Sequence, residues 1–157
     1  MAEGEFAFVK QHMEHARSKQ ATWVGDHDLY ALLADAAVQQ RDVAALQQYA
    51  PLAEETATRY DHKLYEAIAH RAWGVAHRLA GEYADAEGRL KKALHLFSSL
   101  NTRWQIGRTL FELGELAVAQ PNTAGARDYF TRALAAFEEM RASPDAARTR
   151  VALEALG

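Results

Sequence analysis

The second half of the sequence repeats with a period of 40 residues, and this restricts the possible folds more than any other feature. "GRTLFELGEL" occupies residues 107–116, and "ARTRVALEAL" occupies residues 147–156. The same shift pairs Gly74 with Gly114, Ala86 with Ala126, Leu90 with Phe130, Ala93 with Ala133 and Phe97 with Phe137. Because a unit of this size cannot bury its apolar face alone, we expect successive units to stack and share a core.

Apolar residues recur at helical spacing along the chain, and no window alternates as a strand would. Only three prolines and nine glycines are present, which favours helix almost everywhere. We predict an all-α fold of about eight helices, at 4–20, 27–40, 42–58, 62–80, 83–100, 102–120, 123–142 and 144–156. Pro51 falls inside the third helix and is expected to kink or interrupt it.

Two glycines of the repeat lie inside predicted helices. A glycine there costs about 1 kcal/mol relative to alanine. We therefore expect Gly74 and Gly114 to mark places where a second helix approaches closely, with Ala86 and Ala126 supplying the facing small surface.

The repeated positions follow the order of a known motif. Leu113 and Gly114 are followed at the motif's spacing by Ala126, Phe130 and Ala133, and the preceding copy has Gly74, Ala86 and Ala93. This pattern resembles the tetratricopeptide repeat, a helix–turn–helix unit of 34 residues. Ser98 and Glu138 replace its closing proline, so the second helix can extend by about a turn and a half. Such long repeats resemble those of bacterial ATPase-type signalling regulators and nucleotide cyclases.

The resemblance implies a single domain over residues 1–157, built as a right-handed solenoid of antiparallel helix pairs. Its expected parts are an N-terminal helix at 4–20, a degenerate repeat at 27–60, clear repeats at 66–103 and 106–143, and a terminal helix at 144–156.

In this family the first helix of each pair lines a concave groove that binds peptides or protein segments. Carried onto this chain, the groove positions are Ile68, Arg71, Val75, Arg78, Arg108, Phe111, Glu115, Val118, Arg148 and Val151. Arginines beside aromatic and apolar surface suit an acidic or carboxylate-ended peptide. The simpler alternative is that these arginines are solvated on helix exteriors.

Composition excludes several other classes of protein. The net charge of −3 does not suggest a nucleic-acid-binding protein. The absence of cysteine excludes a disulfide scaffold and a thiolate nucleophile. The N-terminus lacks the features of a signal peptide, and no apolar stretch is long enough for a membrane span. We expect a cytoplasmic protein without a cofactor.

Candidate chemical residues are sparse. His12 and His15 lie one turn apart, but no third metal ligand is obvious. His70, Trp73 and His77 share one helix face, which would suit either a small-ligand pocket or core packing. No phosphate-binding loop or nucleophile motif is present. We expect a non-catalytic peptide-binding scaffold; the alternatives are a homodimer formed through the last helix and a small-ligand sensor at the His70 face.

Overall fold

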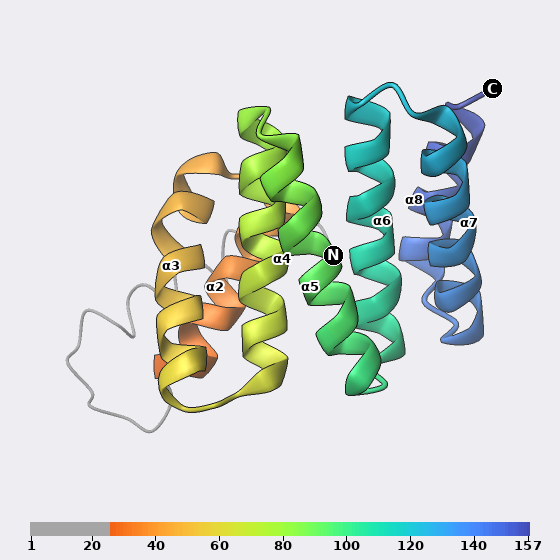
Figure 1. Ribbon diagram of the computed structural model, residues 1–157. Coiled ribbons are helices and arrows are strands. Elements are labelled where there is room, and N and C mark those ends of the chain that lie inside the picture. Colours follow the sequence, from red (N-terminus) through yellow and green to blue (C-terminus); the bar gives the residue numbers. More distant parts are fainter. Residues whose placement is uncertain (1–25) are drawn as a thin grey trace.

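The computed structural model describes residues 26–157, and these residues form seven helices and no strand. The helices are α2 (Asp26–Gln40), α3 (Val43–Arg59), α4 (Lys63–Ala80), α5 (Tyr83–Ser99), α6 (Arg103–Ala119), α7 (Thr123–Glu139) and α8 (Ser143–Glu154). They stand side by side in chain order, from α2 and α3 at one end to α7 and α8 at the other (Figure 1). The predicted all-α solenoid of antiparallel helix pairs is confirmed. The helix expected at 4–20 lies outside the described residues.

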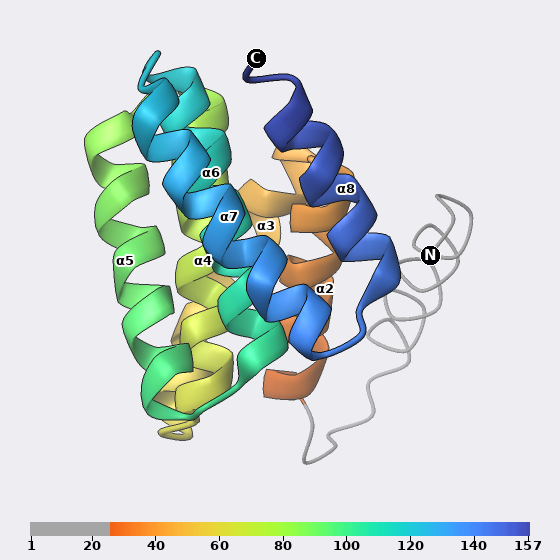
Figure 2. The same cartoon turned by 90° about the vertical axis from the view of Figure 1, so that its right-hand side faces the viewer.

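The chain pairs α2 with α3, α4 with α5 and α6 with α7, and α8 then packs against α7. The first helices of successive pairs also contact each other, α2 with α4 and α4 with α6. Figure 2 shows α2 and α8, the first and last described helices, on the same side of the stack. The first helices therefore form one continuous layer, on which the candidate site lies.

Five of the turns between helices have one residue in the left-handed backbone conformation at the same position of the turn. Arg41, Asp61, Asn101 and Arg141 have φ between 50° and 55°, and Gly81 has φ 81°. The next residue then donates its backbone N–H to a carbonyl five positions earlier, as in Glu82 to His77 at 2.9 Å. This is the Schellman arrangement, which usually favours glycine at the left-handed position. Four of the five turns therefore adopt it without glycine, and most of the helix ends predicted from sequence still agree with the structure to within one residue.

The two repeated glycines do mark close contacts between helices. A Cβ atom on Gly74 would lie 2.5 Å from Leu90 Cγ, and one on Gly114 would lie 2.5 Å from Phe130 Cε1. The expectation that Ala86 and Ala126 supply the facing surface holds in part: the Ala86 carbonyl oxygen lies 3.3 Å from the Gly74 Cβ position, but the nearest contacts at both glycines come from the side chains one turn later. Leu90 and Phe130 are themselves paired by the 40-residue shift, so the repeat preserves a contact between a glycine and a large side chain.

Pro51 does not interrupt its helix, although interruption was one of the two outcomes that the sequence predicted. The helix α3 runs from Val43 to Arg59 with Pro51 inside it. Pro51 is exposed, so the backbone carbonyl that loses its hydrogen bond lies on the solvent side of the helix. Burial of the opposite face, which includes Tyr49 and Ala53, holds the helix together.

Candidate ligand-binding face

Two buried arginines share one carboxylate on the layer of first helices. Arg71 of α4 donates from Nη2 to Asp35 Oδ1 at 2.8 Å, and Arg108 of α6 donates from Nη1 to Asp35 Oδ2 at 2.8 Å. Arg71 is fully buried and Arg108 is 5% exposed. Asp35 of α2 thus links three helices that are not consecutive in the chain.

A second carboxylate bridges two more arginines. Glu112 of α6 accepts hydrogen bonds from Arg41 Nη1 at 2.8 Å and from Arg78 Nη2 at 3.3 Å. Glu112 is 4% exposed, and Arg78 also lies 3.9 Å from the carboxylate of Glu115. Arg41 directly follows α2, and Arg78 belongs to α4. Glu112 therefore connects these two helices to α6, as Asp35 does.

The ionisation of both carboxylates is stabilised by these partners. Burial by itself raises the pKa of Asp35, but Arg108 and Arg71 outweigh it and hold the pKa below its ordinary value. Burial likewise raises the pKa of Glu112, and Arg41 and Arg78 more than reverse it. Burial and the neighbouring Arg108 lower the pKa of Arg71 to about 10, which leaves it charged at neutral pH.

The structure brings the predicted groove arginines together, but α2 covers two of the predicted groove positions. Arg71 and Val75 are fully buried, so the expectation that they line an open surface was wrong. The physical reason is α2: Asp35 covers Arg71, and Val75 packs in a core cluster with side chains of α2 and α3. Ile68 and Phe111 are also core residues, at 7% and 5% exposure.

Arg108 is buried as well, at 5% exposure, whereas the other groove positions reach solvent. Glu115 is partly exposed, while Val118 and Val151 are 47% and 65% exposed. Arg148 of α8 is exposed, and its guanidinium lies over the ring of Phe111, 4.1 Å from the centroid. Among the described residues, Arg148 makes no ion pair or hydrogen bond within the chain. It differs in this from Arg71, Arg78 and Arg108.

A cleft of about 300 Å³ opens beside Arg148, between α2, α6 and α8. Its lining combines both charges with apolar surface: Asp35, Gln39, Trp104, Arg108, Pro144, Asp145 and Arg148. Trp104 is 39% exposed, donates from Nε1 to Asp145 at 2.9 Å, and lies under the guanidinium of Arg108 at 4.8 Å. The indole therefore offers a fixed apolar wall.

Sequence reasoning found Arg108 and Arg148 but missed the other cleft residues. Trp104 precedes Arg108 by four positions and Asp145 precedes Arg148 by three, so helical spacing could have placed both on the same face. Asp35 and Gln39 carry no such signal. They reach the cleft only because α2 folds back across α4 and α6.

The face that carries His70, Trp73 and His77 is occupied by internal contacts. His70 is 3% exposed, and its Nδ1 lies 2.9 Å from Arg89 Nη1. Burial and the nearby Lys92 and Arg89 lower the pKa of His70, so its imidazole is neutral at pH 7. Trp73 donates to Glu54 at 2.7 Å. His12 and His15 lie outside the described residues.

The described helices include none that is both long and apolar enough to cross a lipid bilayer.

Comparison with known proteins places the fold but not a family. No family model matches the sequence, and no curated protein matches it. Among solved structures, the chain is similar to BtubC (BKLC) from P. vanneervenii, with a TM-score of 0.71 and 18% identity. The match covers 98% of this chain and 66% of BtubC, so the chain spans just under two thirds of that protein. At this identity the similarity establishes a shared helical architecture.

Proposed function

We propose that this chain is a non-catalytic, tetratricopeptide-like scaffold that binds an acidic segment of another protein in the cleft between α2, α6 and α8. The proposal places it in the cytoplasm, as the interaction segment of a larger bacterial regulator. The observation that carries the proposal is the guanidinium of Arg148, which faces the cleft without an ion-pair partner among the described residues.

The 40-residue repeat supports a carboxylate as the group that would pair with Arg148. Arg108 and Arg148 occupy the same position in successive units, 40 residues apart. Arg108 receives its carboxylate from Asp35 of α2. A carboxylate from a partner protein would stand to Arg148 as Asp35 stands to Arg108, in a charge-assisted hydrogen bond.

The balance of charge on this face supports the same partner. Five guanidinium groups gather there, those of Arg41, Arg71, Arg78, Arg108 and Arg148, against four carboxylates, those of Asp35, Glu112, Glu115 and Asp145. One acidic side chain from outside would balance the set. The cleft, at about 300 Å³, is at the small end of ligand sites, and it suits one or two side chains of a bound segment.

A peptide array tests this proposal. The full chain is applied to short peptides that pair glutamate or aspartate with an apolar residue, and to matched peptides with glutamine or asparagine. Affinities for selected pairs are then measured by fluorescence anisotropy. We expect the acidic peptides alone to bind, and Arg148→Gln to weaken binding at least about tenfold, since a charged hydrogen bond contributes about 1.5–3 kcal/mol.

Arg150→Gln is the matched control, because Arg150 lies on the same helix but pairs with Glu138 at 2.6 Å. Equal binding by wild type and the Arg148 variant, or equal binding of acidic and amide peptides, would rule out the proposed contact.

Homodimerisation through α8 is a second candidate, favoured by the exposure of Val151 at 65%. Light scattering on the full chain tests it directly: a dimer that becomes monomeric in Val151→Glu supports this role, and a monomeric wild type rejects it. We do not propose a ligand sensor at the His70 face, because His70 and Trp73 already bond to Arg89 and Glu54.

A further inference from the structure

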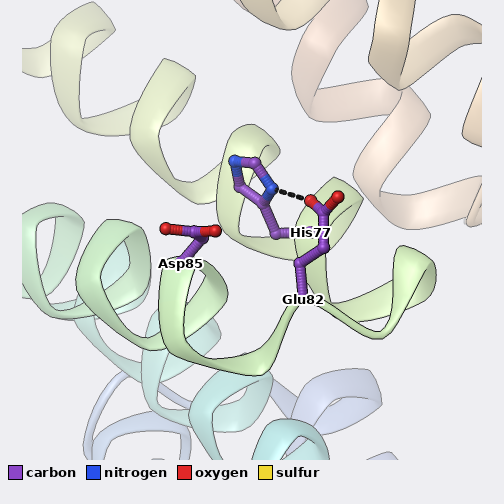
Figure 3. A group of neighbouring side chains, drawn as sticks. All are labelled: His77, Glu82 and Asp85. Atoms are coloured by element: carbon purple, nitrogen blue, oxygen red, sulfur yellow. Dashed lines mark hydrogen bonds and ion pairs between the residues drawn. The ribbon is translucent and has the colours of Figure 1, made fainter.

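A group of potential metal ligands lies at the turn between α4 and α5, away from the cleft. His77 belongs to the last turn of α4, Glu82 is the N-cap residue of α5, and Asp85 lies in the first turn of α5. Gly81, with φ 81°, makes the left-handed turn that reverses the chain between them. Figure 3 shows the three side chains gathered on one side of this turn.

The donor atoms are close enough to share one ion. One ligand atom from each residue lies within 4.8 Å of the other two, and His77 Nδ1 lies 2.5 Å from Glu82 Oε2 (Figure 3). Bonds from a zinc ion to nitrogen or carboxylate oxygen measure about 2.0–2.2 Å, so two ligands of one ion lie about 3–4 Å apart. Small rotations of the exposed Glu82 and Asp85 side chains would reach that arrangement.

The imidazole distinguishes this group from a chance cluster of surface acids. The side chain of His77 is only 21% exposed, and its ring stacks on Trp73 with centroids 5.5 Å apart and planes at 21°. Trp73 is fixed in turn by its hydrogen bond to Glu54 at 2.7 Å. The ring is therefore held with Nδ1 toward Glu82 (Figure 3), as the supporting contacts of metal-binding histidines usually achieve.

Within the described part of the chain, the two carboxylates make no ion pair with a lysine or an arginine. The ion pair recorded for Glu82 is with His77, and Asp85 has no hydrogen bond or ion pair among these residues. Glu82 holds the N-cap position, yet its side chain makes no capping hydrogen bond. Two like charges brought together at this distance repel each other, and a bound dication would remove that repulsion.

We infer that His77, Glu82 and Asp85 form a binding site for a divalent transition-metal ion, with Zn²⁺ as the ion it suits best. A nitrogen ligand with two carboxylates favours Zn²⁺ over Mg²⁺ or Ca²⁺, which take oxygen ligands. Three protein ligands leave a fourth position for water. A bound ion would tie the end of α4 to the start of α5 and stabilise the folded chain.

Zinc titration of the full chain tests the site, by competition with a chromophoric chelator. We expect one Zn²⁺ to bind with an affinity that falls at least about tenfold in His77→Gln and in Asp85→Asn. We also expect zinc to raise the melting temperature of wild type more than that of either variant. Because Asp85 is exposed, its variant is expected to fold normally, which circular dichroism checks.

Control variants separate this site from other histidines. His95→Gln removes an exposed imidazole of α5, and a His12→Gln/His15→Gln double variant removes the pair near the N-terminus. Binding that survives in both control variants and is weakened in His77→Gln and Asp85→Asn supports the site. Absence of zinc binding by wild type, or affinity unchanged in the His77 and Asp85 variants, would overturn it; the carboxylates would then serve only to complement the dipole of α5.

Discussion

Asp35 of α2 accepts a hydrogen bond from Arg108 of α6 at 2.8 Å across 73 residues of sequence. The same carboxylate receives Arg71 of α4 at 2.8 Å. This single side chain therefore connects α2 of the first helix pair to α4 of the second and α6 of the third. It also covers the guanidinium of Arg71, so the open cleft is lined by Arg108 and Arg148 and not by Arg71.

Removing the Asp35 charge is expected to destabilise the fold. Asp35→Asn leaves the buried guanidiniums of Arg71 and Arg108 without a counter-charge, and breaking such a pair costs about 3–5 kcal/mol. Urea unfolding measures the change in the free energy of unfolding. Glu115→Gln is the control, since Glu115 is 32% exposed and 3.9 Å from Arg78, and should cost less than about 1 kcal/mol. Equal stability of Asp35→Asn and wild type would show that the buried ion pair is not needed.

Acid should weaken the fold through the same carboxylates. The pKa values of Asp35 and Glu112 lie below those of the unfolded chain, which are about 3.9 and 4.3. Their contribution is present in full above the unfolded pKa values and is lost as pH falls through the lower folded values. Urea unfolding between about pH 5 and pH 3 should show this loss, with a shallower slope in Glu112→Gln. A free energy of unfolding that stays constant over this range would contradict the prediction.

His70 should add a separate pH dependence at higher pH. Its folded pKa is lowered, so below about pH 6.5 the unfolded chain binds a proton that the folded chain excludes. The free energy of unfolding is therefore expected to fall as pH decreases from about 7 toward the folded pKa. His70→Gln should flatten the curve in this window, whereas His95→Gln, at an exposed position, should leave it unchanged. The same slope in both variants would assign the effect to another group.

The contact between Gly114 and Phe130 makes a clear prediction about packing. In Gly114→Ala the new Cβ would lie 2.5 Å from Phe130 Cε1, so the ring must move, at a cost of about 1–3 kcal/mol. Gly88→Ala is the matched control, because nothing lies within 4 Å of a Cβ there and the change should stabilise α5 by about 0.5–1 kcal/mol. Thermal unfolding of both variants compares the two effects. Equal shifts in melting temperature would mean that helix propensity alone decides.

The all-α class and the 40-residue repeat could be predicted because both depend on the spacing of apolar and small residues along the chain. The shift that pairs Gly74 with Gly114 also pairs Leu90 with Phe130, and each glycine contacts its large partner. An interruption at Pro51 did not occur because a local rule about proline does not account for the burial of the opposite face of α3. The left-handed turns at Arg41 and Arg141 could not be predicted from residue type, because arginine does not favour that conformation, whereas Asp61 and Asn101 are residue types that adopt it more readily.

The sequence by itself determined that this chain forms stacked helix pairs, because periodic apolar and small residues specify which faces must be buried. It also placed Arg71, Arg78, Arg108 and Arg148 on related positions of the first helices. Only the tertiary structure decided which of these arginines would be neutralised. The carboxylates of Asp35 and Glu112 lie far from their partners in sequence, and the strength of an ion pair depends on distance and burial in space. Arg148 therefore makes no ion pair among the described residues, for a reason that no local pattern contains.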